Sequence, residues 1–211
     1  VAQADKVLMV IGEDWDWSGE AASRTDIGVP GIQSELLKMI ASAGKPVAVV
    51  LLNGRPLVLE EESKAADAIL EAWYPGTMGA EAVTDIVFGQ YNPSGKLTMT
   101  FPRSVGQIPV FYYEKNTGRP IYLPNDKYKS NYLDSPNEPL YPFGYGLSYT
   151  EFASEVIDIE VNGQIVELTV KVTNIGKYAF ADCHSSLYTE YEYGTYVRSG
   201  DNPYFLLIDV T

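Results

Sequence analysis

The residues from Gly12 to Asp26 include the side chains best suited to chemistry in this sequence. This segment holds five carboxylates, one arginine and two tryptophans, which is unusual for a plain connection. A tryptophan ring offers a flat apolar face to the C–H face of a sugar, while carboxylates and arginine hydrogen-bond hydroxyls. A carboxyl group crowded by other carboxylates is harder to ionise, so one of them could keep its proton near neutral pH and act as a general acid.

Glu20 is the candidate for this acid, because small residues flank it on both sides and leave room for a ligand. The alternative is a solvated acidic loop whose tryptophans pack against neighbouring structure. The local residues alone leave both interpretations open.

The elements around this segment predict a parallel α/β layer. The apolar run 6–11 is typical of a strand buried on both faces, and 46–52 is a second such strand. A helix over 30–43 joins them, with Pro30 in its first turn, and this spacing predicts a βαβ unit. In such sheets, ligands bind beyond the carboxyl ends of the strands, where the acidic segment lies. The apolar face expected for this helix consists of Ile32, Leu36, Met39, Ile40 and Ala43.

The predicted alternation of helices and strands continues to about residue 101, and the composition then changes. A helix near 60–66, a strand over 68–73, a helix over 78–88 and a strand over 96–101 complete an α/β layer in the first hundred residues. Residues 102–148 hold seven prolines and many tyrosines, which predicts a linker that lies on the body of the protein. From Val156 the alternation predicts two strands, joined by a tight turn at Asn162-Gly163.

Composition narrows the possible functions. The formal net charge of -13 argues against a nucleic-acid partner and is compatible with a neutral or cationic substrate. The single cysteine, Cys183, excludes an intrachain disulfide, and with only one histidine, His184, a multi-histidine metal site is excluded too. We expect no metal, no cofactor and no membrane span, because no apolar run approaches the ~20 residues that a span needs. The first residues do not resemble a signal peptide.

Several separate blocks resemble the second domain of glycoside hydrolase family 3 β-glucosidases, of the bacterial periplasmic type, over roughly residues 5–178. The blocks share their order with that family as well as their residues. They are Ser18-Gly19-Glu20-Ala21-Ala22-Ser23-Arg24-Thr25-Asp26, Asn53-Gly54-Arg55-Pro56, Trp73-Tyr74-Pro75-Gly76, Asn92-Pro93-Ser94-Gly95-Lys96-Leu97, Asn116-Thr117-Gly118-Arg119-Pro120 and Tyr141-Pro142-Phe143-Gly144-Tyr145-Gly146-Leu147-Ser148-Tyr149.

This resemblance implies a fold and an activity. Family members have a TIM-barrel domain, an α/β sandwich and a fibronectin type III-like domain, and they remove terminal β-linked glucose with retention of configuration. By this resemblance, residues 1–107 are the C-terminal part of the sandwich, with a mostly parallel sheet. Residues 108–152 are the Pro/Tyr-rich linker, and 153–211 are an incomplete fibronectin type III-like sandwich. A periplasmic or secreted location is implied as well.

The resemblance also assigns roles within the acidic segment. Glu20 matches the general acid/base of the family, which acts with an aspartate nucleophile on the barrel, ~5–5.5 Å away. Arg24 matches a recurrent arginine that is expected to orient a carboxylate or a hydroxyl. Trp15 and Trp17 are candidates for stacking on the leaving sugar, with a core or lid role as the alternative. We expect Glu13 to be structural, pointing toward backbone donors.

Two departures from the family limit these expectations. The barrel and the start of the sandwich lie outside this sequence, so we expect the 211-residue chain alone not to hydrolyse glycosides. The family pattern also ends after about Lys177, as a frame error or a truncated gene would explain.

A β-xylosidase or another exo-β-glycosidase of the family, or a noncatalytic carbohydrate-binding module, remains an alternative. A nucleotide-binding domain is less favoured because no Gly-x-Gly-x-x-Gly segment is present, and histidine-dependent hexosaminidases are disfavoured by the Ser-Gly-Glu segment.

Overall fold

The computed structural model describes residues 1, 3–115, 118–119, 128–163, 165–176 and 190–197. The chain divides into two compact units. The first combines residues 1–84 and 95–146, and the second combines residues 85–94 and 147–211. The first unit contains a parallel sheet and the candidate site, and the second contains an antiparallel sheet.

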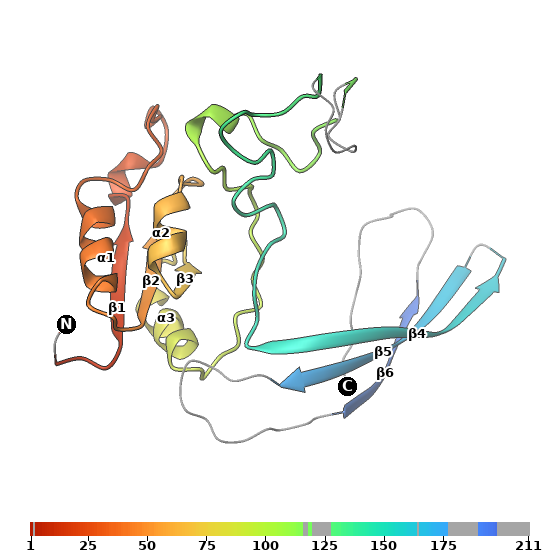
Figure 1. Ribbon diagram of the computed structural model, residues 1–211. Helices are drawn as coiled ribbons and strands as arrows, with labels where there is room; N and C mark the ends of the chain where they lie inside the picture. The colour runs from red at the N-terminus through yellow and green to blue at the C-terminus, as the bar shows by residue number, and fades with distance from the viewer. Residues whose placement is uncertain (2, 116–117, 120–127, 164, 177–189, 198–211) are drawn as a thin grey trace. The chain divides into compact units, whose positions relative to one another are not determined.

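Three parallel strands form the sheet of the first unit, in the order β1 (Val7–Gly12), β2 (Val47–Leu52) and β3 (Ala68–Glu71) (Figure 1). Helix α1 (Gln33–Ala41) joins β1 to β2, and α2 (Glu60–Ala65) joins β2 to β3. The two helices contact each other on one face of the sheet. The predicted βαβ arrangement is therefore confirmed, and all three strands end at the same edge.

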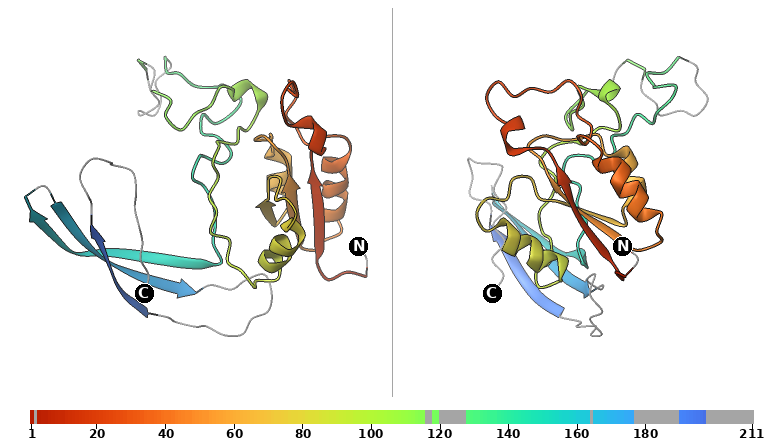
Figure 2. Two further views of the ribbon diagram at one scale, coloured as in Figure 1. Left: turned by 180° about the vertical axis from the view of Figure 1, so that it is seen from behind. Right: turned by 90° about the vertical axis from the view of Figure 1, so that its left-hand side faces the viewer.

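The core lies between β2 and the two helices. Val47, Val49 and Leu51 of β2 are almost completely buried, since alternate residues of a strand point to the same face. Leu37 of α1 and Phe101 complete this cluster, in which each buried apolar side chain contributes about 1.5–3 kcal/mol. Helix α3 (Gly79–Val87), which was also predicted, lies on the opposite face of the sheet from α1 (Figure 2).

The first strand is covered on one face only. Leu8 and Val10 are 47% and 59% exposed, so the prediction that this strand is buried on both faces is wrong for this chain. The reason is its position: β1 is the edge strand of the sheet, and no element among the described residues covers the face that carries these two side chains.

The predicted apolar face of the first helix is wrong for all of its residues except Ile40. Leu37 is the buried residue of α1, and Ile40 is partly buried beside it. The orientation follows from Gln33, whose side chain hydrogen-bonds both the N–H and the carbonyl of Gly12 and so turns this side of the helix toward the sheet. Pro30 precedes the helix and does not lie in its first turn. The predicted core residues that are exposed instead are Ile32, Leu36, Met39 and Ala43.

Leu97, Phe101, Leu140 and Tyr141 pack in or against the core, and the described residues between 96 and 146 form no regular strand. The predicted strand over 96–101 is wrong: Leu97 and Phe101 each donate one backbone hydrogen bond, to Tyr145 and Tyr141, instead of joining a ladder. A short 3-10 helix, η2 (Val105–Gln107), follows. The side chain of buried Gln107 donates to the carbonyl of Pro136 at 3.0 Å. This hydrogen bond joins η2 to the residues near Pro136.

The second unit is an antiparallel sheet of β4 (Thr150–Asn162), β5 (Ile165–Gly176) and β6 (Glu190–Val197). The predicted hairpin forms, although Asn162 is the last paired residue, opposite Ile165, and Gly163 takes the positive φ of 65°. Asn92 supports the start of the sheet by accepting the N–H of Tyr149 at 2.9 Å. The predictions for Cys183, His184 and the tail fall outside the described residues.

Candidate active site

The acidic segment forms a loop that leaves the carboxyl end of β1 and contains a short 3-10 helix, η1 (Trp15–Trp17). Its first residue still continues the sheet, since Glu13 N–H donates to the carbonyl of Leu52 at 2.8 Å. The turns that follow the other two strands also contact the loop. Side chains from the ends of all three strands therefore position it.

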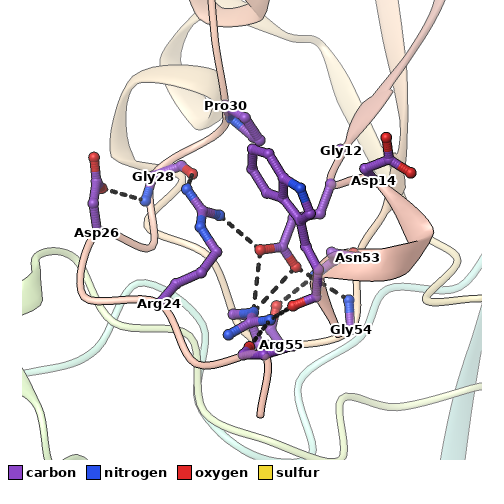
Figure 3. A network of polar contacts seen from close by, with 12 residues as sticks. Gly12, Asp14, Arg24, Asp26, Gly28, Pro30, Asn53, Gly54 and Arg55 are labelled. Atoms are coloured by element: carbon purple, nitrogen blue, oxygen red, sulfur yellow. Dashed lines mark hydrogen bonds and ion pairs between the residues drawn. The ribbon is translucent and has the colours of Figure 1, made fainter. Parts of the chain in front are cut away.

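Glu13 is the buried centre of this arrangement, with a side chain that is 0% exposed. Its Oε1 lies 2.6 Å from Nη1 of Arg24 and 3.1 Å from Nε of Arg55, and its Oε2 accepts the N–H of Gly54 at 3.4 Å. Figure 3 shows Arg24 and Arg55 reaching this carboxylate from two sides. A buried carboxylate is tolerated when cations and N–H donors surround it in this way. The burial of Glu13 agrees with the structural role expected for this residue. Its partners are two arginines and one backbone N–H, whereas backbone donors alone were expected.

Arg55 also binds the backbone of the loop. Its Nη2 donates to the carbonyls of Trp17 and Ala22, the latter at 3.0 Å. These two carbonyls stand on either side of the turn 18–21. Within the turn, Ala22 N–H donates to the carbonyl of Gly19 at 3.3 Å, and Ala21 has a positive φ of 61°.

Glu20 occupies the exposed tip of this turn. Its carboxylate makes no hydrogen bond or ion pair with any other residue that the structure describes. The side chain is therefore accessible to a ligand at the carboxyl-end edge of the sheet, which is where α/β proteins commonly bind ligands.

The two tryptophans differ in their surroundings. Trp15 is 80% exposed, whereas Trp17 is 40% exposed. The guanidinium carbon of Arg24 lies over the Trp17 ring, 4.9 Å from the ring centroid. Arg24 is thereby engaged on several sides, because it also binds Glu13 and donates to the carbonyl of Gly28 at 3.4 Å. The structure thus brings Arg24 and Trp17 together, while Trp15 forms no ring contact with another described residue.

Two further contacts fix the loop, and sequence reasoning assigned them no role. A Cβ at Gly54 would lie 2.0 Å from Oγ of Ser18, so only glycine allows this approach. The hydroxyl of Tyr74 donates to the carbonyl of Asp14 at 3.0 Å. With Arg55, these residues belong to the turns after β2 and β3 that support the loop. Their position directly after two predicted strands was the signal that could have identified them.

A second buried carboxyl lies at the end of β3. Oε1 of Glu71 accepts the N–H of Trp73 at 2.9 Å, while its Oε2 is buried without a partner among the described residues. Burial raises the pKa of Glu71 to about 7, against the opposing effect of the Trp73 N–H and the Asn53 side chain. Glu71 therefore gains or loses a proton in the neutral pH range, and no arginine among the described residues pairs with it.

A cavity lies apart from the acidic loop. This cavity of about 350 Å³ is lined by residues of α2 and of the segment 103–136, and includes the ion pair of Arg103 with Glu60. Within the described ranges, no cluster of His, Cys, Asp and Glu could hold a metal ion. No helix in that part of the chain has the length and apolar character to cross a membrane.

Comparisons with known proteins match residues 1–149 to the glycosyl hydrolase family 3 C-terminal domain. The periplasmic beta-glucosidase of Salmonella typhimurium is 51% identical over 183 residues, covering 83% of this chain, and a beta-xylosidase of Formosa agariphila is 44% identical over 179 residues, covering 82%. The crystal structure of a beta-glucosidase from Listeria innocua superposes with a TM-score of 0.77 at 44% identity, over 83% of this chain and 25% of that one.

The chain spans about a quarter of the length of these relatives, 24% for each of the two curated proteins. The family match nevertheless covers most of the chain and all of the first unit. It includes the loop that carries Glu20 and the turns that support it. The chain therefore belongs to glycosyl hydrolase family 3, as a C-terminal domain of that family.

Proposed function

We propose that the chain supplies the general acid/base carboxyl of a retaining, exo-acting β-glucosidase, and that Glu20 is this group. The observation that carries the proposal is the contrast between an exposed Glu20 and the buried Glu13 network that supports its turn. A general acid must reach its substrate and keep a fixed position, and this arrangement provides both.

The reaction would proceed in two steps. First, Glu20 gives its proton to the glycosidic oxygen while the bond from that oxygen to the anomeric carbon breaks and a second carboxylate bonds to the anomeric carbon. Then Glu20, now a carboxylate, takes a proton from water, and the water oxygen displaces the second carboxylate to release the sugar. Two carboxyls about 5–5.5 Å apart are needed for this route.

The second carboxylate would come from a partner region, an N-terminal TIM-barrel domain such as the sequence resemblance implies. On this proposal the 211-residue chain alone has no glycosidase activity. Residues 1–107 would complete an α/β sandwich, 108–152 would serve as linker, and 153–211 would belong to a fibronectin type III-like domain. The name of the Salmonella typhimurium relative favours a periplasmic or secreted location.

The substrate would be a neutral β-glucoside or oligosaccharide. A net charge of -13 disfavours anionic ligands, and the open face of Trp15 suits stacking on the leaving sugar. Arg24 and Trp17 would shape the same side of the site as a contacting pair. A structure of the Listeria innocua enzyme in complex with laminaribiose supports a glucoside, and the Formosa agariphila relative makes a β-xyloside the second candidate.

The test is a chimera in which residues 1–149 replace the matching segment of the Salmonella typhimurium enzyme. We expect Glu20→Gln to slow hydrolysis of an alkyl β-glucoside by about 10²–10⁴-fold. A dinitrophenyl β-glucoside should be much less affected in its first step, because its leaving group needs no proton. Added azide should restore turnover of the activated substrate by replacing water.

Asp14→Asn is the matched control, since Asp14 is an exposed carboxylate of the same loop. We expect it to keep the rates of the parent on both substrates. An equal loss of kcat/KM on both substrates in Glu20→Gln, or no loss at all, would refute the acid/base role, because kcat/KM reports the first step. Binding of glycans that persists without turnover in every chimera would favour the noncatalytic alternative.

A further inference from the structure

We infer that Arg55 is the positioning residue for Glu20: its guanidinium fixes the turn that carries the acid/base carboxyl. This inference rests on the proposed function of Glu20. Arg55 comes from the turn after β2 and donates to backbone carbonyls of the loop, so it acts on Glu20 through the backbone.

The contacts of Arg55 enclose the turn. One nitrogen, Nη2, donates to the carbonyls of Trp17 and Ala22, and these residues stand immediately before and after the four-residue turn. A single planar group therefore sets the distance between the two ends of the turn. Because the Glu20 side chain has no partner of its own among the described residues, its direction depends on the backbone of this turn.

Buried Glu13 holds the guanidinium itself in place. Nε of Arg55 lies 3.1 Å from Oε1 of Glu13, while its Nη2 donates to the two carbonyls. The Glu13 side chain is fully buried and further held by Arg24, so it cannot follow a displaced loop. Arginine presents its donors in a rigid fork, whereas a lysine ammonium is a point charge that would pair with Glu13 but not span both carbonyls.

Such positioning has a measurable catalytic consequence. A general acid must lie within about 2.6–3.2 Å of the oxygen that it protonates, and a misplacement of about 1 Å can cost about 10²-fold in rate. Loss of Arg55 should therefore slow the steps in which Glu20 transfers a proton, without weakening sugar binding to the same degree.

The first measurement uses the 211-residue chain itself. Amide hydrogen exchange at Trp17 and Ala22, whose N–H groups donate within the loop, reports whether the turn has loosened. We expect Arg55→Met to speed this exchange at least tenfold while the amides of β2 keep their protection. Arg55→Lys retains the charge beside Glu13 and should give an intermediate value. Unchanged exchange at both amides in Arg55→Met would overturn the inference.

Arg103→Met is the matched control, because Arg103 also pairs with a carboxylate and donates to a backbone carbonyl, with a similar exposure of 26% against 19% for Arg55. It makes no contact with the loop. Both variants lose an arginine ion pair, but Arg55 pairs with the fully buried Glu13 and Arg103 with the partly exposed Glu60. Arg55→Lys keeps a charge beside Glu13, so its difference from the parent isolates the contacts to Trp17 and Ala22.

The second measurement uses the chimera described above. We expect Arg55→Met to lower kcat about 10–100-fold on an alkyl β-glucoside, with KM changed less than threefold, and to lower kcat/KM much less on a dinitrophenyl β-glucoside, whose first step needs no proton. Arg103→Met should not shift the ratio between the two substrates. If Glu20→Gln shows this leaving-group dependence and Arg55→Met does not, the positioning role is wrong and the function stands. If Glu20→Gln lacks it too, the proposed function itself has failed.

Discussion

Two carboxylates of one loop, Glu13 and Glu20, have opposite surroundings. Glu13 is fully buried and receives two arginines and a backbone N–H, whereas Glu20 is exposed at the tip of a turn. The difference follows from their distance to the sheet, because Glu13 directly continues the strand pairing while Glu20 lies beyond η1. One carboxylate of the loop is therefore buried and paired with arginines, and the other is exposed and has no partner among the described residues.

The comparison is tested most strongly by removing each charge in turn. Glu13→Gln should lower the free energy of unfolding of the chain by about 3 kcal/mol, because it leaves Arg24 and Arg55 without their shared partner. Glu20→Gln should change it by less than about 0.5 kcal/mol, as expected for an exposed site. Urea unfolding measures both values. Similar losses for the two variants would remove the distinction.

Glu71 is a second buried carboxyl, and it differs from Glu13 because no arginine among the described residues pairs with it. Its pKa is raised to about 7 by burial, so the folded state holds the proton more tightly than the unfolded state does. The associated stability is complete below about pH 4.5 and is lost as the pH rises through about 7, with a total of about 3 kcal/mol.

We therefore expect Glu71→Gln to flatten the dependence of stability on pH between 4.5 and 8. The variant should match the parent near pH 4.5 and exceed it near pH 8, where the parent must bury a charge. Urea unfolding across this range decides the matter. If the free energies of unfolding of the parent and of Glu71→Gln differ by the same amount at every pH, Glu71 does not titrate in this range.

The smallest expected effect distinguishes the two tryptophans. Trp17→Ala should cost about 0.5–1 kcal/mol of stability, because it removes the ring on which Arg24 lies. Trp15→Ala should cost nothing measurable, since that side chain is 80% exposed, and should act only on the KM of the chimera. Thermal unfolding of the two variants checks the difference, and an equal loss for both would contradict it.

Much of this architecture follows from the sequence because its signals are local. Buried runs such as 47–52 and the spacing between them were enough to predict the parallel sheet and its helices. The family resemblance predicted the segment that carries Glu20, and the family match includes it. The acid/base role of Glu20 stays a prediction.

The errors came from interactions that are remote in sequence. The orientation of α1 depends on Gln33 reaching back to Gly12, so the helical pattern of Ile32, Leu36 and Met39 was misleading. Glu13 was expected to face backbone donors, but its main partners are arginines 11 and 42 positions away. Periodicity describes neighbours along the chain and carries no information about such contacts.

Gly54 has a further consequence for how this loop can be moved between proteins. Because Ser18 occupies the space that any side chain at position 54 would need, the loop and the turn beneath it fit only as a matched pair. An engineer who grafts residues 13–24 onto another scaffold must therefore transfer the Asn53-Gly54-Arg55 turn as well. The same constraint couples the two segments in inheritance, since a change in either is tolerated only when the other still accommodates it.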